Sequence, residues 1–150
     1  MSELVFDVSL HPRPRGAVAG AMLRDARGDW PTLVVPREAA GERMAIDFDL
    51  ALERLAALER LYVEPDGSFV WVGPGNEGRW QIDGNAYERL GRVLVVEVKG
   101  RCPIAEWDRF LNVWGWPADP LMVQLVRAGV FVDEPTFRRL AAVRGTIAEG

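Results

Sequence analysis

The stretch Val93-Leu94-Val95-Val96-Glu97-Val98-Lys99-Gly100 is the strongest strand signal in the chain. It is rich in valine, which favours the pleated backbone of a β-strand. Alternate side chains of a strand share a face, so Glu97 and Lys99 are expected beside each other on the face of Val93 and Val95. Both faces are apolar over most of the stretch, which predicts a central strand covered on both sides. An acid and a base then stand together at its C-terminal end.

Shorter strand-like runs lie before this stretch. Runs rich in β-branched and aromatic residues, bounded by proline, glycine and aspartate, predict strands. Pro65-Asp66-Gly67 is typical of a hairpin turn between two such runs, and Gly84-Asn85 predicts a second turn. The expected strands are residues 4–8, 32–35, 44–48, 61–64, 68–72, 79–83 and 92–99.

Helical spacing of apolar residues appears in three further places. A helix over about residues 50–60 follows Asp49, which can cap its N-terminus. A second helix is predicted by one apolar face comprising Trp107, Phe110, Leu111 and Trp114. Asp119-Pro120 predicts the start of another helix, which ends at Gly129, and Asp133 is the expected cap of a last one. Residues 16–27 and 37–41 give no clear pattern.

This order of elements predicts the α+β class. We expect one domain over residues 1–150, with a mixed central sheet, a helix before the β-meander and two to three helices in the C-terminal third. A chain of 150 residues is long enough to bury its own core without disulfides or structural metals. The first 48 residues have no role that their sequence identifies.

Composition narrows the classes of function. The formal net charge of −4 disfavours a broad basic surface for nucleic acid. No apolar run is long enough to span a membrane, and the N-terminus lacks the basic start of a signal peptide. The only cysteine, Cys102, cannot form an internal disulfide, which suits a reducing compartment and predicts a cytoplasmic protein.

The inventory of catalytic side chains is short. His11 is the only histidine, and it stands in the proline-rich, loop-like run 11–16. Histidine-based metal sites need several ligands, and a Ser-His arrangement would depend on this one residue. Catalysis, where present, therefore depends on carboxylates, arginines or Lys99, the only lysine, and no organic cofactor is expected.

Asp83 stands fourteen positions before Glu97, on the strand expected to precede it. Where these strands pair, the two carboxylates approach each other and repel unless a proton or cation intervenes. Mg²⁺ prefers such oxygen ligands, and the metal can bind a phosphate and activate water. Lys99, on the face of Glu97, can stabilise the charge that builds on the phosphate. The sequence therefore offers Asp83 and Glu97 as metal ligands and Asp83, Glu97 and Lys99 as catalytic residues.

Asp83-Gly84 followed by a strand ending in Glu97-Val98-Lys99 resembles the PD-(D/E)xK nuclease superfamily over roughly residues 50–128. The resemblance implies magnesium-dependent hydrolysis of a phosphodiester, with nucleic acid, most often DNA, as the partner. It also implies a further acid on the first helix, for which Glu53 or Glu59 is available, and a glutamine on a later helix, for which Gln124 is available. The chain departs from the motif at Ile82, where the family has proline.

A second hypothesis is a non-catalytic, acidic protein-binding module: an inhibitor, an immunity-type partner or an assembly subunit. One form of this hypothesis is a nuclease-like fold that has lost its catalytic activity and retains binding. Glu97 and Lys99 are then a simple ion pair at a strand end, and Asp83 is an ordinary turn residue. Arg13 and Arg15, like Arg138, Arg139 and Arg144, can face a phosphate or merely solvent. Cys102 is expected to be a structural thiol, and Trp71 and Trp80 are expected in the core.

Overall fold

The computed structural model describes residues 3–75 and 79–149, without the side chains of residues 143–149. Its main feature is a nine-stranded sheet in the order β2-β5-β11-β10-β1-β9-β8-β7-β6. The strands are β1 (Glu3–Pro12), β2 (Val18–Ala19), β5 (Leu33–Val34), β6 (Leu61–Val63), β7 (Ser68–Val72), β8 (Gln81–Arg89), β9 (Arg92–Pro103), β10 (Leu121–Leu125) and β11 (Val130–Asp133). A small hairpin, β3 (Leu23–Asp25) and β4 (Gly28–Trp30), stands apart from this sheet.

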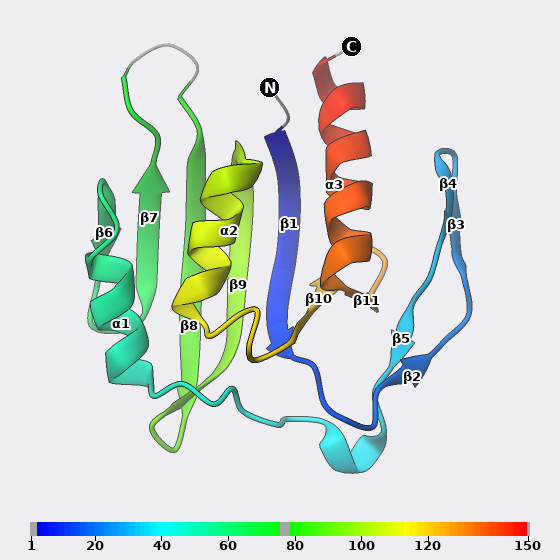
Figure 1. Cartoon of the computed structure of the whole chain (residues 1–150), viewed down its shortest axis with the longest axis horizontal. Helices are drawn as coiled ribbons and strands as arrows, with labels where there is room; N and C mark the ends of the chain where they lie inside the picture. Colours follow the sequence, from blue (N-terminus) through cyan, green and yellow to red (C-terminus); the bar gives the residue numbers. More distant parts are fainter. Residues whose placement is uncertain (1–2, 76–78, 150) are drawn as a thin grey trace.

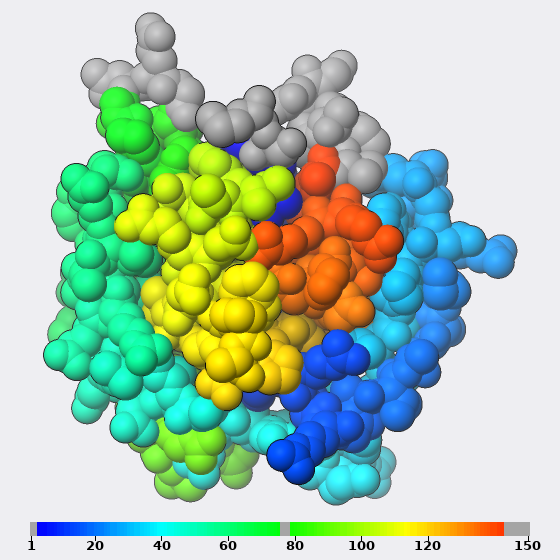
Figure 2. All heavy atoms as spheres, in the orientation of Figure 1, coloured from blue at the N-terminus to red at the C-terminus, as the bar shows by residue number. Residues whose placement is uncertain are grey.

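Three α-helices lie on one face of the sheet (Figure 1). They are α1 (Phe48–Ala56), α2 (Ile104–Val113) and α3 (Glu134–Glu149), and a short 3-10 helix η1 spans Arg37–Ala39. The space-filling view shows the three helices side by side over the left and centre of this face (Figure 2). The predicted α+β class is confirmed, although the pairings of the described strands are all antiparallel rather than mixed. No helix among the described residues is long and apolar enough to cross a membrane.

The core lies between the helices and the sheet and is built from aromatic rings. Trp107 of α2 is fully buried, and its ring centroid lies 4.8 Å from that of Phe6 on β1 and 5.2 Å from that of Phe137 on α3. Phe110, one turn further along α2, packs against Phe69 at 5.8 Å. The predicted apolar stripe of α2 is therefore confirmed as a packing face, which joins two helices and the centre of the sheet.

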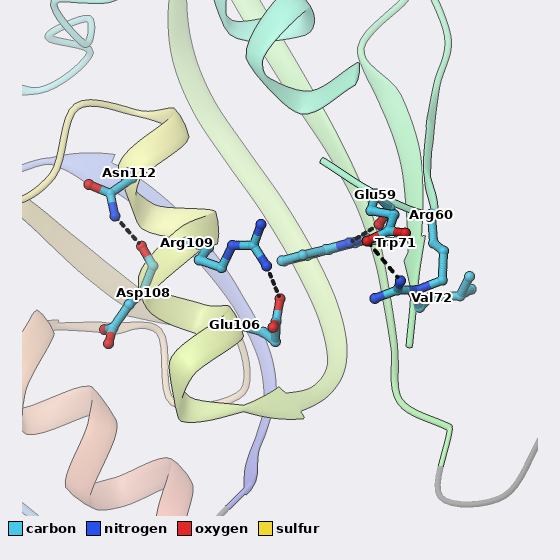
Figure 3. Close-up of polar contacts among 8 residues, drawn as sticks. All are labelled: Glu59, Arg60, Trp71, Val72, Glu106, Asp108, Arg109 and Asn112. Atoms are coloured by element: carbon cyan, nitrogen blue, oxygen red, sulfur yellow. Dashed lines mark hydrogen bonds and ion pairs between the residues drawn. The ribbon is translucent and has the colours of Figure 1, made fainter. Parts of the chain in front are cut away.

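Polar contacts on the helix-covered side fix the β6–β7 hairpin (Figure 3). The indole Nε1 of buried Trp71 donates a hydrogen bond of 2.9 Å to the carbonyl of Glu59. Arg60 Nε donates to the carbonyl of Val72 at 3.0 Å. These bonds join the segment after α1 to β7, so the predicted hairpin is held at its open end as well as at its turn.

Three predicted elements are wrong. Residues 44–48 form no strand: they contain only the isolated bridge of Asp47 to Arg92, and α1 begins at Phe48. The helix predicted between Asp119-Pro120 and Gly129 is instead strand β10 and the turn that leads to β11, because β10 completes the ladder beside β1. Gly84-Asn85 is no turn: β8 continues through it to Arg89. Gly84 lies directly across from Phe69, and a Cβ there would stand 2.3 Å from the Phe69 ring, so the glycine makes room for that ring.

The strand β9 changes its alternation at one point. Tyr87 pairs with Val95 and Glu88 pairs with Val93, so Leu94 is the additional residue of a β-bulge. Val93 is fully buried toward the helices, whereas Leu94 and Val95 both line a pocket on the other face. The prediction that Val93 shares a face with Val95 is therefore wrong, although Val95, Glu97 and Lys99 do share one.

The prediction that both faces of β9 are covered is also wrong. Opposite the helices, the described chain places no α-helix on the sheet, and only the segment of residues 35–42 with η1 lies against one end (Figure 1). Glu97 and Lys99 are consequently exposed. We call this surface the open face; its exposed side chains on the central and β6-side strands are Asp7, Tyr62, Gln81, Asp83, Tyr87, Arg89, Glu97, Lys99 and Arg101.

Candidate functional site

The three predicted site residues lie on the open face of two neighbouring strands. Lys99 of β9 is directly across from Asp83 of β8 and, on its other side, from Asp7 of β1. Glu97 is across from Asn85 and Ser9, so Asp83 and Glu97 are diagonal neighbours. Such positions are about 7–8 Å apart between Cα atoms. The structure therefore brings the three residues onto one surface, with lysine rather than Glu97 nearest to Asp83.

Neighbouring side chains form hydrogen bonds with the carboxylates of both Asp83 and Glu97. The Gln81 amide nitrogen lies 3.0 and 3.2 Å from the two oxygens of Asp83. The Tyr87 hydroxyl donates a 2.7 Å hydrogen bond to Glu97 Oε1, and this bond raises the pKa of Tyr87 above its ordinary value because ionising the phenol would remove the donor. Lys99 forms none of the ion pairs found among the described residues.

The other residues that the nuclease resemblance implies lie elsewhere. Glu53 belongs to α1 and Glu59 follows that helix, so both lie on the helix-covered side of the sheet. Gln124 is on strand β10 rather than on a helix, which corrects that expectation. Among the side chains that the structure describes, in residues 3–75 and 79–142, no three of histidine, cysteine, aspartate or glutamate group closely enough to hold a metal ion. Two carboxylate donors suit Mg²⁺ chemically, and the remaining ligands would be water and phosphate.

The open face has an acidic balance around Lys99 and carries both tyrosines of the chain. In that part of β1, β8 and β9 it presents four acids, Glu3, Asp7, Asp83 and Glu97, and two cations, Lys99 and Arg101, a formal charge of −2, and Arg89 adds one cation at the far end of β8. Tyr62 on β6 is 68% exposed and Tyr87 on β8 is 42% exposed. Tyrosine is enriched in protein interfaces because its ring buries a large area while its hydroxyl stays hydrogen-bonded.

A pocket of about 350 Å³ opens on the same face, beside the acidic residues. Its floor includes Val95, two residues before Glu97 on β9, and the bulged Leu94. The segment 39–42 forms part of its wall, and Met122 and Phe131 supply a flexible thioether and an aromatic ring. A shallower recess of about 450 Å³ next to it shares Phe131 and contains the half-exposed Met22 and Val34.

His11 supplies the main polar group of the first pocket. It is on strand β1, not in a loop as predicted, and its ring stands edge-on to Phe131 with centroids 5.1 Å apart. The imidazole Nε2 lies 2.8 Å from Ser9 Oγ, which is hydrogen-bonded to Gln124 at 3.3 Å. Burial lowers the pKa of His11, and the contact with Gln124 only partly offsets this, so the imidazole is neutral at pH 7.

Sequence reasoning missed this pocket and both tyrosines. The sequence of β1 could have indicated the position of His11. Alternate residues of this strand, Leu4, Phe6, Val8 and Leu10, point into the core, and the same alternation places His11 on the other face. The bulge at Leu94 had no comparable signal, because valine and leucine are equally suited to either face.

Comparison with protein-family models, curated proteins and solved structures finds no match to the chain. The resemblance to the PD-(D/E)xK nucleases therefore rests on Asp83, Glu97 and Lys99 alone.

Proposed function

We propose that this protein is a non-catalytic binding module of the inhibitor or immunity type, which docks a basic protein on its open face. The observation that carries the proposal is the concentration on one uncovered sheet face of exposed tyrosines, acidic side chains and an apolar pocket. Antiparallel sheets often have one solvated face, but that face is usually polar throughout. A cytoplasmic location belongs to the same proposal.

Charge complementarity identifies the chemistry of the partner. The formal charge of −2 around Lys99 is part of a net charge of −4 for the whole chain, and both steer a cationic surface toward this part of the molecule. Lys99 is flanked by Asp7 and Asp83, so its positive charge is compensated by theirs and does not repel a basic partner. Lys99 would instead help to orient the partner on the face.

The 350 Å³ pocket provides an anchoring point beside these charges. Interface energy is concentrated in a few well-packed apolar or aromatic side chains, surrounded by polar contacts that exclude water. Val95, Met122 and Phe131 offer such a recess for an apolar side chain of the partner, and the neutral imidazole of His11 can be buried there without an ionic partner. Tyr87 connects this recess to Glu97.

Affinity capture followed by reconstitution tests the proposal. The wild-type protein and the double variant Asp83→Lys/Glu97→Lys are immobilised and exposed to extracts of the source cells. The matched control is Glu53→Lys/Glu59→Lys, which makes the same charge change at exposed positions on the helix-covered side. A captured protein is then purified and titrated against all three forms at two salt concentrations.

We expect a basic partner that binds the wild type and the control equally and the open-face variant about 100-fold more weakly at low salt. Equal binding of the partner by all three forms would contradict docking on the open face. Loss of binding in the control alone would indicate that the partner docks on the helix-covered side.

The magnesium-dependent phosphodiesterase is a second candidate function. One observation favours it: Asp83, Glu97 and Lys99 share an exposed face on adjacent strands, with Lys99 directly across from Asp83. In that case Asp83 and Glu97 would hold Mg²⁺ and Lys99 would stabilise the phosphate in hydrolysis of nucleic acid. We favour the binding module because the two carboxylates are diagonal and each is hydrogen-bonded to a neighbour.

A cleavage assay separates the two candidates. DNA and RNA are incubated with the wild type, Glu97→Ala and Lys99→Ala in Mg²⁺ or Mn²⁺. The binding proposal predicts no metal-dependent cleavage by any form. Cleavage by the wild type that both substitutions abolish would establish the nuclease instead.

A further inference from the structure

A second pocket, of about 270 Å³, lies at the end of the sheet where β1 ends and β9 and β10 begin. Four arginines from three separate parts of the chain line it: Arg13, Arg15, Arg43 and Arg92. Figure 2 shows the blue, cyan and yellow-orange segments meeting at the lower end of the helix-covered side, where residues 12–16, 42–45 and 114–121 come together. It shares Pro12 and Glu42 with the wall of the 350 Å³ pocket, but none of the four arginines lines that pocket.

The backbone around these arginines is fixed by hydrogen bonds between the segments. The Arg13 amide donates to the carbonyl of Pro120 at 3.0 Å, which ties the end of β1 to the start of β10. The Met44 amide donates to the carbonyl of Val93 at 2.8 Å, and Arg92 Nε donates to the carbonyl of Met44 at 2.9 Å. The arginines therefore converge because the fold holds their Cα positions, not because flexible loops meet by chance.

The positive charge in this pocket is not neutralised by ion pairs. None of the ion pairs among the described residues involves these four arginines. Glu42 and Asp119 line the same pocket, so four cations face two acids, a formal charge of +2. The whole chain carries a net charge of −4, so a positively charged pocket is an exception on this molecule. The four guanidinium groups repel one another in the absence of a bound anion.

Hydrogen-bond donors remain available in the pocket. Arg92 uses Nε for a carbonyl, and Arg43 uses one terminal nitrogen for long contacts of 3.3 and 3.4 Å to the carbonyls of Arg89 and Leu90. Each guanidinium has five N–H groups, so most of them stay free to bind an anion.

We propose that this pocket binds a small, multiply charged oxyanion of the phosphate type. Planar guanidinium groups bind phosphate oxygens in pairs, and a single anion with several oxygens can bridge arginines that otherwise repel one another. Pyrophosphate, with more charge and more oxygens than phosphate, engages more of the four arginines and binds more tightly. A nucleoside diphosphate presents the same chemistry from a second source.

Isothermal titration calorimetry with phosphate, pyrophosphate and ADP at low salt tests the site. Arg13→Gln and Arg15→Gln alter exposed side chains and leave the core untouched. The matched control is Arg127→Gln, an exposed arginine in the turn between β10 and β11, at the other end of β10. Each pocket substitution is expected to weaken pyrophosphate binding about tenfold, and the control to leave it unchanged.

Saturable pyrophosphate binding that falls in both pocket variants and persists in Arg127→Gln supports the proposal. ADP binding tighter than pyrophosphate identifies a nucleotide as the source of the anion, and weaker ADP binding identifies free phosphates. Failure of all three anions to bind the wild type overturns the proposal. Equal losses in Arg15→Gln and Arg127→Gln overturn it as well, because they indicate attraction by overall charge. Neither result bears on the binding of a protein partner.

Discussion

Replacing Gly84 by alanine tests how β8 presents Asp83 and Asn85 to the open face. The added Cβ would lie 2.3 Å from Cζ and 2.7 Å from Cε2 of Phe69, and 2.9 Å from the carbonyl oxygen of Glu97. Phe69 is only 3% exposed and packs against Phe110, so its ring has little room to move aside. The new methyl group must therefore displace buried atoms rather than the free end of a surface side chain.

The expected effect of Gly84→Ala is a moderate loss of stability. Overpacking a well-filled core costs about 1–3 kcal/mol. Alanine in place of glycine recovers about 0.5–1 kcal/mol, because glycine loses more backbone freedom on folding. The free energy of unfolding should fall by about 1–2 kcal/mol, which lowers Tm by about 2–8 °C in a domain of this size.

A double-mutant cycle with Phe69→Leu identifies the cause. Leucine lacks the distal ring atoms, so it relieves the closest contacts, and the double variant should be more stable than the sum of the single effects predicts by about 1 kcal/mol. Urea unfolding at constant pH measures all four forms. Additive effects within about 0.5 kcal/mol would refute the placement of the Phe69 ring over Gly84.

Three further predictions concern other parts of the molecule. Arg138→Met should lower the free energy of unfolding by about 2–3 kcal/mol in urea, since it leaves the buried Glu134 and the Asp108 carboxylate without their ion pairs; an unchanged unfolding midpoint would contradict this. The pKa of His11 is lower in the folded than in the unfolded chain, so the unfolded chain binds the proton at a higher pH. The free energy of unfolding should therefore decline as pH falls below about 6.5, and His11→Gln should flatten this decline between pH 7.5 and 5.5. Identical pH profiles of the two proteins would disprove the role of His11. Cys102 is fully buried and its pKa is raised by burial, so Ellman's reagent at pH 8 should label it only on unfolding; rapid labelling of the native protein would argue against this burial.

The elements that the sequence predicted well are those with a repeated apolar spacing. The helix carrying Trp107 and Phe110, with Trp114 directly after its last turn, and the hairpin around Asp66 are both present, since periodicity and turn chemistry act locally. Asp133 also caps α3 as predicted, accepting the Thr136 amide at 2.8 Å. By contrast, Asp119-Pro120 precede strand β10 and Gly129 lies in the turn between β10 and β11. Residues that start and end helices equally start and end strands, and pairing of β10 with β1 decided between the two.

The candidate site was predictable only in part. Period two placed Glu97 and Lys99 on one face, and the structure confirms that arrangement. The alternation alone could not indicate that helices cover only the opposite side, since Val95 is equally compatible with a buried or an open face. The arginine pocket was beyond sequence reasoning for a different reason: Arg15, Arg43 and Arg92 are far apart in the chain and meet only through tertiary structure.

The outermost strands of the large sheet are very short. β6 has three residues and β2 has two, although β9 in the interior has twelve. An edge of this length offers few unpaired peptide groups, which disfavours extension of the sheet by a second copy of the chain or a foreign peptide. Recognition is then expected to depend on side chains presented across the strands. Evolution can alter such a surface one residue at a time, without disturbing the hydrogen-bonded ladder beneath it.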